Sequence, residues 1–173
     1  SAVGETACLE CEKGQHASER GSSDCLLCVP GLFAAETTQT YCSACEQGRH
    51  QRKHGEAACD LCSAGRFSGS GQADCHNCSV GTYANSSGLP SCTKCGVGKF
   101  AAAAAAVECD ACDAGLFTSI VGSSVCVSCP VGQFSESVVA TGFAPSSCES
   151  CSAGQYQPLL AQSSCITCTA GRY

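Results

Sequence analysis

Cysteine is the residue in this chain that is best placed to carry chemistry, and its spacing is regular. All 20 cysteines belong to Cys-x-x-Cys pairs: 8/11, 25/28, 42/45, 59/62, 75/78, 92/95, 109/112, 126/129, 148/151 and 165/168. Thiols at this spacing can form disulfides, bind zinc or act as redox centres. The spacing by itself fits zinc ribbons as well as disulfides.

Composition favours disulfides over the other two uses. The 173 residues include no Trp, no Met, 6 Phe and 4 Tyr, so the large side chains of a conventional core are missing. Chains without such a core are stabilised by cross-links and are typical of the secreted class. A redox enzyme would need one activated thiol rather than ten equivalent pairs. We therefore expect disulfides, with no metal and no cofactor.

No catalytic constellation accompanies the cysteines. Carboxylates occur singly, and no glycine-rich phosphate loop or supported Ser-His-Asp order is present. The net charge of −6 argues against nucleic acid as a partner. No apolar run approaches the roughly 20 residues that a membrane span requires. We predict that the chain is not an enzyme and that this segment contains no membrane span.

One basic cluster could make a contact. Arg49, Arg52 and Lys53 lie in the stretch Arg49-His50-Gln51-Arg52-Lys53-His54 and form a candidate contact patch. It could bind an acidic polysaccharide or the acidic face of a neighbouring repeat. The alternative is a solvated loop without a partner.

Both Asn residues of the chain begin Asn-x-Ser sequons. Asn85 lies in a polar loop, which is a good context for an N-linked glycan. Asn77 precedes Cys78, which we expect to be cross-linked, so it is the poorer acceptor. We predict a glycan at Asn85.

The cysteine pairs mark a repeat that must position these residues. Successive pairs are 17 residues apart in seven of nine steps, with one step of 16 and one of 22. Gly follows three residues after each pair: Gly14, Gly31, Gly48, Gly65, Gly81, Gly98, Gly115, Gly132, Gly154 and Gly171. A ring follows two residues later, in what we call the ring slot: His16, Phe33, His50, Phe67, Tyr83, Phe100, Phe117, Phe134, Tyr156 and Tyr173.

These slots predict one short hairpin per repeat. The first Gly permits a positive φ directly after a cross-link. The ring is the one large apolar group, able to cover a disulfide or the neighbouring ring. A second Gly (Gly4, Gly21, Gly55, Gly71, Gly88 and Gly122) lies in a turn composition. His16 and His50 are interpreted as ring substitutes, since nothing pairs them at ligand spacing, and His76 as solvent-facing.

We expect a small disulfide-rich fold, a tandem-repeat rod of two-stranded β-hairpins with little or no helix. Strands should be two to four residues long. The alanines at 101–106 lie in a loop too short to nucleate a helix, and their side chains should contact little. Each repeat should contact mainly its neighbours.

Residues 1–173 are expected to form one continuous array, cut within a repeat at both ends. The predicted repeats are 11–27, 28–44, 45–61, 62–77, 78–94, 95–111, 112–128, 129–150 and 151–167, with partial repeats at 1–10 and 168–173. The array is expected to continue in both directions.

Ten nearly equivalent units favour a disulfide connectivity with the period of the sequence. Joining the second Cys of one pair to the first of the next gives Cys11–Cys25, Cys28–Cys42, Cys45–Cys59, Cys62–Cys75, Cys78–Cys92, Cys95–Cys109, Cys112–Cys126, Cys129–Cys148 and Cys151–Cys165. Cys8 and Cys168 would then pair with cysteines outside this segment. Interlaced pairing, such as Cys8–Cys25 with Cys11–Cys28, is the alternative, but it imposes a two-repeat period that the sequence lacks.

The pattern C-x-x-C-x-x-G-x-[FY]-x4-G-x3-C-x-x-C resembles the ephrin-receptor-like cysteine-rich repeat. Its closing loop is similar to the single-disulfide module of tumour-necrosis-factor-receptor ectodomains. Clear examples are Cys78-Ser-Val-Gly81-Thr-Tyr83 closing at Cys92, and Cys129-Pro-Val-Gly132-Gln-Phe134 closing at Cys148. The resemblance, to the growth-factor-receptor cysteine-rich superfamily, implies an extended, disulfide-laddered ectodomain. It carries over no ligand-binding residue.

Three functions remain open. The first is an extracellular or cell-surface structural segment, a stiff spacer or filament component that contacts neighbouring repeats, other copies or scaffold proteins. The second is a receptor-like stalk that binds a protein or carbohydrate ligand. Its best candidate site is the long loop 135–147 with Phe143. The third and most distant is a multi-zinc Cys-x-x-Cys protein.

Overall fold

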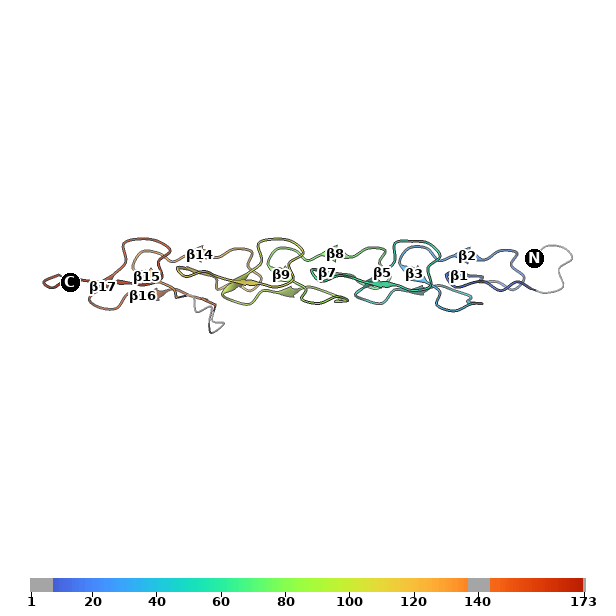
Figure 1. Cartoon of the computed structure of the whole chain (residues 1–173), viewed down its shortest axis with the longest axis horizontal. Coiled ribbons are helices and arrows are strands. Elements are labelled where there is room, and N and C mark those ends of the chain that lie inside the picture. Colours follow the sequence, from blue (N-terminus) through green and yellow to red (C-terminus); the bar gives the residue numbers. More distant parts are fainter. Residues whose placement is uncertain (1–7, 137–143, 173) are drawn as a thin grey trace. The chain divides into compact units, whose positions relative to one another are not determined.

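The computed structural model describes residues 8–136 and 144–172, which form nine two-stranded antiparallel hairpins without a helix (Figure 1). This confirms the predicted fold class of short disulfide-rich hairpins. The pairs are β1 (Gln15–His16) with β2 (Leu26–Leu27), β3 (Leu32–Phe33) with β4 (Ser43–Ala44), β5 (Arg49–His50) with β6 (Asp60–Leu61), β7 (Arg66–Phe67) with β8 (His76–Asn77), β9 (Thr82–Tyr83) with β10 (Thr93–Lys94), β11 (Lys99–Phe100) with β12 (Asp110–Ala111), β13 (Leu116–Phe117) with β14 (Val127–Ser128), β15 (Gln133–Phe134) with β16 (Glu149–Ser150), and β17 (Gln155–Tyr156) with β18 (Ile166–Thr167).

The chain divides into two compact units. One comprises Ser1–Asn77 with Ser86–Cys92 and holds β1 to β8; the other comprises Cys78–Asn85 with Thr93–Tyr173 and holds β9 to β18. The same hairpin recurs within each unit. That the repeats form one continuous array stays a prediction.

The hairpin that begins at Cys28 shows how the repeat folds. Gly31 has a φ of 86°, a left-handed conformation that only Gly adopts without strain, and it turns the chain into β3. The return strand β4 occupies the two positions between Cys42 and Cys45, so Cys-x-x-Cys contains a strand as well as joining two repeats. Cys45 N–H closes the hairpin by donating to the Gly31 carbonyl at 2.9 Å.

Disulfides follow the predicted local pairing. The structure contains Cys11–Cys25, Cys28–Cys42, Cys45–Cys59, Cys62–Cys75, Cys95–Cys109, Cys112–Cys126, Cys129–Cys148 and Cys151–Cys165. Cys78 and Cys92 are also disulfide-bonded. Cys8 and Cys168 are unpaired here, and their bonding to cysteines outside the segment stays a prediction.

The core is made of sulfur and of small or polar groups. The second cysteine of most pairs is fully buried, as at Cys28, Cys62 and Cys112. The residue that follows the ring is buried as well. We call this position the bridging slot, and its buried members are Ala34, Gln51, Ser68, Ala84, Ala101, Thr118, Ser135 and Gln157.

One expectation about contacts was wrong in part. The alanines at 101–106 form no helix, as predicted, but Ala101 is buried in the bridging slot and its carbonyl accepts from Gly81 N–H. Repeats form their backbone hydrogen bonds with their immediate neighbours, and their backbones also closely approach the second repeat onward. A Cβ built on Gly14 would lie 1.9 Å from the carbonyl oxygen of Gly55, two repeats further on. This close approach leaves no room for a side chain.

Candidate functional site

The most elaborated feature of the described residues is the junction between repeats, which is built from backbone hydrogen bonds. The first Gly of one repeat donates its N–H to the bridging-slot carbonyl of the next, as Gly31 does to Gln51 at 2.7 Å. The bridging-slot N–H donates onward to the following repeat, as Gln51 does to Gln72 at 3.3 Å. Because the bridging-slot residue bonds in both directions, it ties three successive repeats together.

A third bond reaches the turn at the hairpin tip. There, a residue with positive φ donates its N–H to the carbonyl of the buried cysteine that opens the preceding repeat. The pairs are Thr38 with Cys11, Gly55 with Cys28, Gly71 with Cys45, Gly88 with Cys62, Ala105 with Cys78, Gly122 with Cys95, and Ala161 with Cys129. The second Gly identified in the sequence therefore marks this position, which Thr or Ala fills in three repeats.

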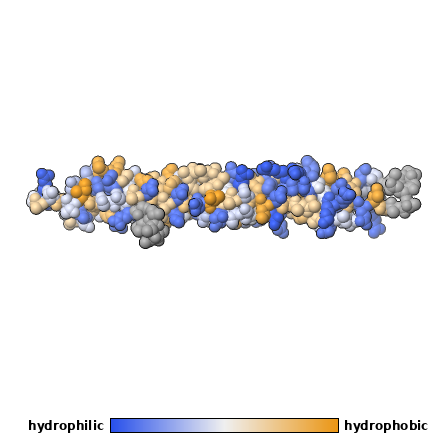
Figure 2. All heavy atoms as spheres, viewed as in Figure 1, coloured by the Kyte–Doolittle hydropathy of each residue, from blue (hydrophilic) through white to orange (hydrophobic). Residues whose placement is uncertain are grey.

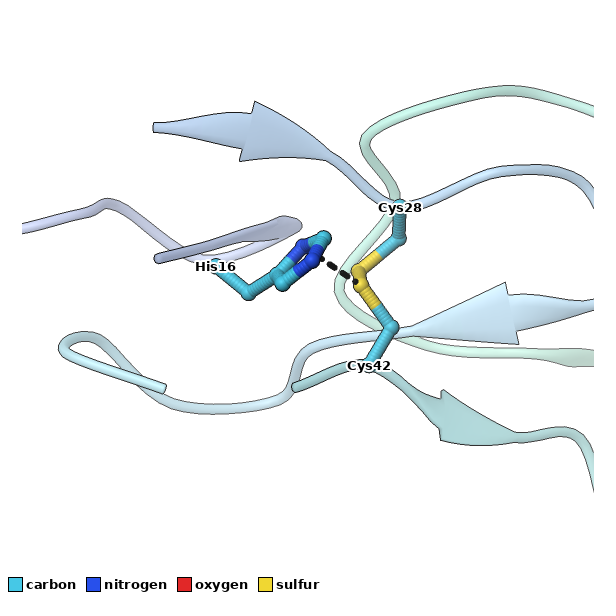
Figure 3. Close-up of side chains that lie close together, drawn as sticks. All are labelled: His16, Cys28 and Cys42. Atoms are coloured by element: carbon cyan, nitrogen blue, oxygen red, sulfur yellow. Dashed lines mark hydrogen bonds between the residues drawn. A yellow bond between two sulfur atoms is a disulfide. The ribbon is translucent and has the colours of Figure 1, made fainter. Parts of the chain in front are cut away.

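The ring slot brings two histidines to disulfides. In Figure 3 the imidazole of His16, on β1, points at the Cys28–Cys42 disulfide of the next repeat, and Nδ1 lies 3.2 Å from Cys42 Sγ. His50, on β5, repeats this contact, with Nδ1 3.2 Å from Cys75 Sγ of the Cys62–Cys75 disulfide.

The expectation that nothing pairs these histidines at ligand spacing was wrong. His16 with Cys28 and Cys42, and His50 with Cys62 and Cys75, each place three ligand atoms within 4.8 Å of one another. The partners come from the next repeat, so the spacing within one repeat could not reveal them. Their place in the ring slot also confirms that a ring here can cover a disulfide. His76 is exposed, with its ring centroid 5.8 Å from that of Phe67.

The structure gives each residue of the predicted contact patch a partner within the chain. Arg49 donates from Nη1 to the carbonyl of Cys59 at 2.9 Å. Arg52 forms an ion pair with Asp74 of the next repeat, and Lys53 Nζ lies 4.0 Å from Glu56. The Arg52 and Asp74 side chains are more than half exposed, so the pair adds little stability. The ion pair with Asp74 is a contact between this cluster and an acidic side chain of the neighbouring repeat.

The two sequons differ in local structure. Asn85 is exposed and follows the buried Ala84, just before a turn. Asn77 is exposed on the return strand β8, next to the buried, disulfide-bonded Cys78. The glycan at Asn85 stays a prediction.

Part of the long loop 135–147, the best candidate for ligand binding, lies outside the described residues, and Phe143 belongs to that part. Its first residue, Ser135, occupies the bridging slot, where Oγ donates to the Leu116 carbonyl at 3.0 Å. That end of the loop therefore serves the junction.

Sequence reasoning missed the bridging slot because its residue types vary. Ala, Ser, Thr and Gln share no hydropathy, and their burial depends on backbone bonds rather than on side-chain type. The position is constant, however: it always follows the ring. A search for constant position instead of constant chemistry could have found it.

Comparison with known protein families agrees with this geometry. Residues 65–108 and 98–145 match the family model described as tyrosine-protein kinase ephrin type A/B receptor-like. These residues therefore resemble ephrin-receptor-like cysteine-rich repeats. The tandem disulfides outside the match follow the same pattern, consistent with the wider cysteine-rich repeat superfamily. No curated protein matches the chain significantly.

The match to ephrin-receptor-like repeats suggests a coarse functional class. Such repeats are receptor-like or structural modules, typically without enzymatic activity, and the many disulfides suggest an extracellular location. Within the described residues, no helix is long and apolar enough to cross a membrane. The face drawn in Figure 2 intersperses hydrophilic and hydrophobic residues.

Proposed function

We propose that this segment is an extracellular spacer of a cell-surface, appendage or matrix protein. The observation that carries the proposal is the junction of backbone hydrogen bonds, which recurs in both units with the same partners. Each repeat is also closed by its own disulfide. Such an array should resist bending and proteolysis because each repeat is closed by a disulfide and bonded to the repeats on either side.

The bridging-slot side chains that form hydrogen bonds support the spacer function, since they serve their own array. Ser68 Oγ donates to the Arg49 carbonyl at 2.8 Å, and Gln157 Nε2 donates to the Ser164 carbonyl at 2.7 Å. We infer that the partners are neighbouring repeats of a longer chain, together with other copies or scaffold proteins in an assembly.

The spacer proposal is tested by imaging the native assembly with an antibody against the described repeats. A spacer gives label at a fixed distance from the assembly surface, or at a regular lateral spacing, with and without added soluble proteins. Saturable binding of one soluble ligand to the isolated chain, with label scattered on the surface, would overturn it.

A receptor-like stalk is the second candidate, and the family match favours it. Residues 65–108 and 98–145 of the sequence match a receptor-like family model. Contact with a ligand would then come from the exposed hairpin tips, such as Ile120 and Val121, whose side chains are 67% and 56% exposed. Replacing both with Ser should abolish ligand binding and leave the disulfide map unchanged. The third candidate, a multi-zinc Cys-x-x-Cys protein, is disfavoured because the cysteines of these pairs form disulfides.

Asn85 is proposed as the glycan attachment site. Expression in a secretory host should yield one N-glycan, detected by peptide-N-glycosidase release in 18O-water, which converts the modified Asn to an 18O-labelled Asp. The glycan should be lost in Asn85→Gln and retained in Asn77→Gln, because the Asn77 sequon is constrained by its strand and by disulfide-bonded Cys78. A glycan at Asn77 instead would contradict this assignment.

A further inference from the structure

Two of the disulfides lie against a histidine in the ring slot, a position that holds Phe or Tyr in the other repeats. We propose that Cys28–Cys42 with His16, and Cys62–Cys75 with His50, are reductively gated sites for a thiophilic divalent cation of the zinc class. Oxidised, each is a disulfide covered by an imidazole. Reduced, each presents two sulfurs and one nitrogen, the ligand types that zinc prefers.

The chemistry has two balanced steps. Two molecules of a thiol reductant transfer two electrons and two protons to the Cys28–Cys42 bond, which gives two protein thiols and the disulfide of the reductant. Zinc then displaces one proton from each thiol and binds two thiolates and His16 Nδ1. Water or an external ligand fills the fourth position, as at zinc sites with three protein ligands.

The observed geometry is close to what the ion requires. Zinc–sulfur bonds of about 2.3 Å and zinc–nitrogen bonds of about 2.0 Å place tetrahedral ligand atoms roughly 3.5–3.8 Å apart. Nδ1 already lies 3.2 Å from the Cys42 sulfur, and all three ligand atoms lie within 4.8 Å of one another. Breaking the bond lets the two sulfurs separate to that range.

The backbone keeps the site in place after the disulfide opens. Cys28 N–H donates to the Gly14 carbonyl at 2.9 Å, and its carbonyl accepts from Gly55 N–H at 2.8 Å. Cys62 is held in the same way between Gly48 and Gly88. Cys42 and Cys75 are half-buried whereas Cys28 and Cys62 are buried, so the more exposed side of each bond is that of Cys42 or Cys75.

Because the neighbouring disulfides stay closed, zinc binding at an opened disulfide depends on the histidine. When only Cys28–Cys42 is reduced, the pair-mates Cys25 and Cys45 remain bonded to Cys11 and Cys59, so no Cys-x-x-Cys dithiol competes for the ion. An opened disulfide then offers two thiolates, and only an imidazole in the ring slot adds a third ligand. Cys45–Cys59 is the matched control, because the preceding repeat has Phe33 in that slot.

The experiment equilibrates the full chain in a series of glutathione redox buffers, with free Zn²⁺ either absent or fixed by a chelator. Rapid alkylation and peptide mass spectrometry give the reduced fraction of each disulfide. Zinc should raise the reduced-to-oxidised ratio of Cys28–Cys42 and Cys62–Cys75 by about 100-fold when free Zn²⁺ is a hundred times Kd, by mass action. The ratio for Cys45–Cys59 should shift far less.

Variants in the ring slot separate the histidine from the thiolates. His16→Phe should remove the zinc effect at Cys28–Cys42 alone, and His50→Phe at Cys62–Cys75 alone; both introduce the ring most common in that slot, so folding is retained. Phe33→His should create a zinc effect at Cys45–Cys59. An equal zinc effect at every disulfide, a zinc effect that survives His16→Phe, or no effect at micromolar free Zn²⁺ would each overturn the proposal.

Discussion

At the scale of single residues, the hairpin tips show how the repeat tolerates departures from its own pattern. Thr38, Ala105 and Ala161 have φ values of 61°, 60° and 57°, where other repeats have Gly. Side chains strain this left-handed conformation. Each of the three nevertheless donates its N–H to a cysteine carbonyl of the preceding repeat. The junction therefore holds these three residues in a left-handed conformation that is strained for a residue with a side chain.

Replacing Ala105 with Gly should stabilise the second unit by about 1 kcal/mol, because it relieves the left-handed strain, less the entropy that Gly adds to the unfolded chain. Hydrogen exchange of the residue 105 amide, which bonds to the Cys78 carbonyl at 2.8 Å, measures the change as slower exchange. Ala104→Gly is the matched control. It lies in the same loop without a positive φ, so exchange should be faster. The prediction fails if both variants change exchange in the same direction.

The first Gly of each repeat can be required for two reasons: its positive φ, and the close approach of another part of the backbone. Gly31 and Gly132 allow the two effects to be measured separately. Gly31 has a φ of 86°, and a Cβ there would lie 2.2 Å from the Gly71 carbonyl oxygen. Gly132 has a similar φ of 77°, but in the described structure a Cβ there would meet no atom within 4 Å.

Gly31→Ala should therefore cost about 3 kcal/mol or more, from strain plus backbone overlap, whereas Gly132→Ala should cost only about 1–2 kcal/mol, from strain alone. Urea unfolding with the disulfides intact, followed by hydrogen exchange at each site, measures both. Equal losses of folding free energy would show that the close approach of Gly31 to the Gly71 carbonyl does not add to the cost of a side chain.

At the scale of the hairpin, a buried amide braces the loop from inside. Gln51 Nε2 donates to the Ala58 carbonyl at 2.8 Å, and its Oε1 accepts from Lys53 N–H at 3.0 Å. Gln157 makes the corresponding bonds to Ser164 and Leu159 in the repeat 151–167. The side-chain amide thus spans the loop between the ring and the closing cysteine. Its two hydrogen bonds stabilise the loop where a larger protein would use hydrophobic packing.

Gln51→Ala should destabilise its repeat by about 1–3 kcal/mol, because a part-buried carbonyl and N–H lose their partners. Faster exchange of the Lys53 amide and increased proteolysis within 51–58 measure the loss. Gln72→Ala, which truncates an exposed Gln, should change stability by less than about 0.5 kcal/mol. Similar effects from both variants would mean that Gln51 does not brace the loop.

How far the hairpin could be predicted follows from which interactions depend on residue type. Disulfide partners, positive-φ glycines and the strand length were predictable, because Cys and Gly have few other reasons to recur at a fixed period. The return strand between the two cysteines, the bridging slot and the histidine–disulfide contacts were not. They arise from backbone bonds and from packing between repeats, where Ala34, Gln51 and Ser68 are equivalent despite their chemistry.

At the scale of the molecule, stability is distributed over many local staples. Each hairpin has its own disulfide, and the junctions bond each repeat mainly to those next to it. Arrays of this kind behave as a sum of local stabilities and neighbour terms rather than as one cooperative unit. Damage to one repeat should then stay close to it.

Removing one interior disulfide tests this. Replacing both Cys112 and Cys126 with Ala should cost about 3 kcal/mol, the chain-entropy value for a loop of this size. Hydrogen exchange should increase for 112–128 and for the adjoining amides of Gly98 and Cys129, which bond to Thr118 and Gly115. Gly31 N–H, in the other unit, should keep its protection. Loss of protection throughout the chain would instead show a single cooperative fold.

The junction has one more consequence, which concerns how such a chain changes in length. Its bonds join amides to carbonyls, so they do not depend on which side chains the adjoining repeats have. A duplicated or deleted unit of 17 residues meets the same donors and acceptors on both sides. No new interface has to evolve. Recombination between misaligned copies of the gene can therefore lengthen or shorten the protein in whole repeats, and selection can act on length directly.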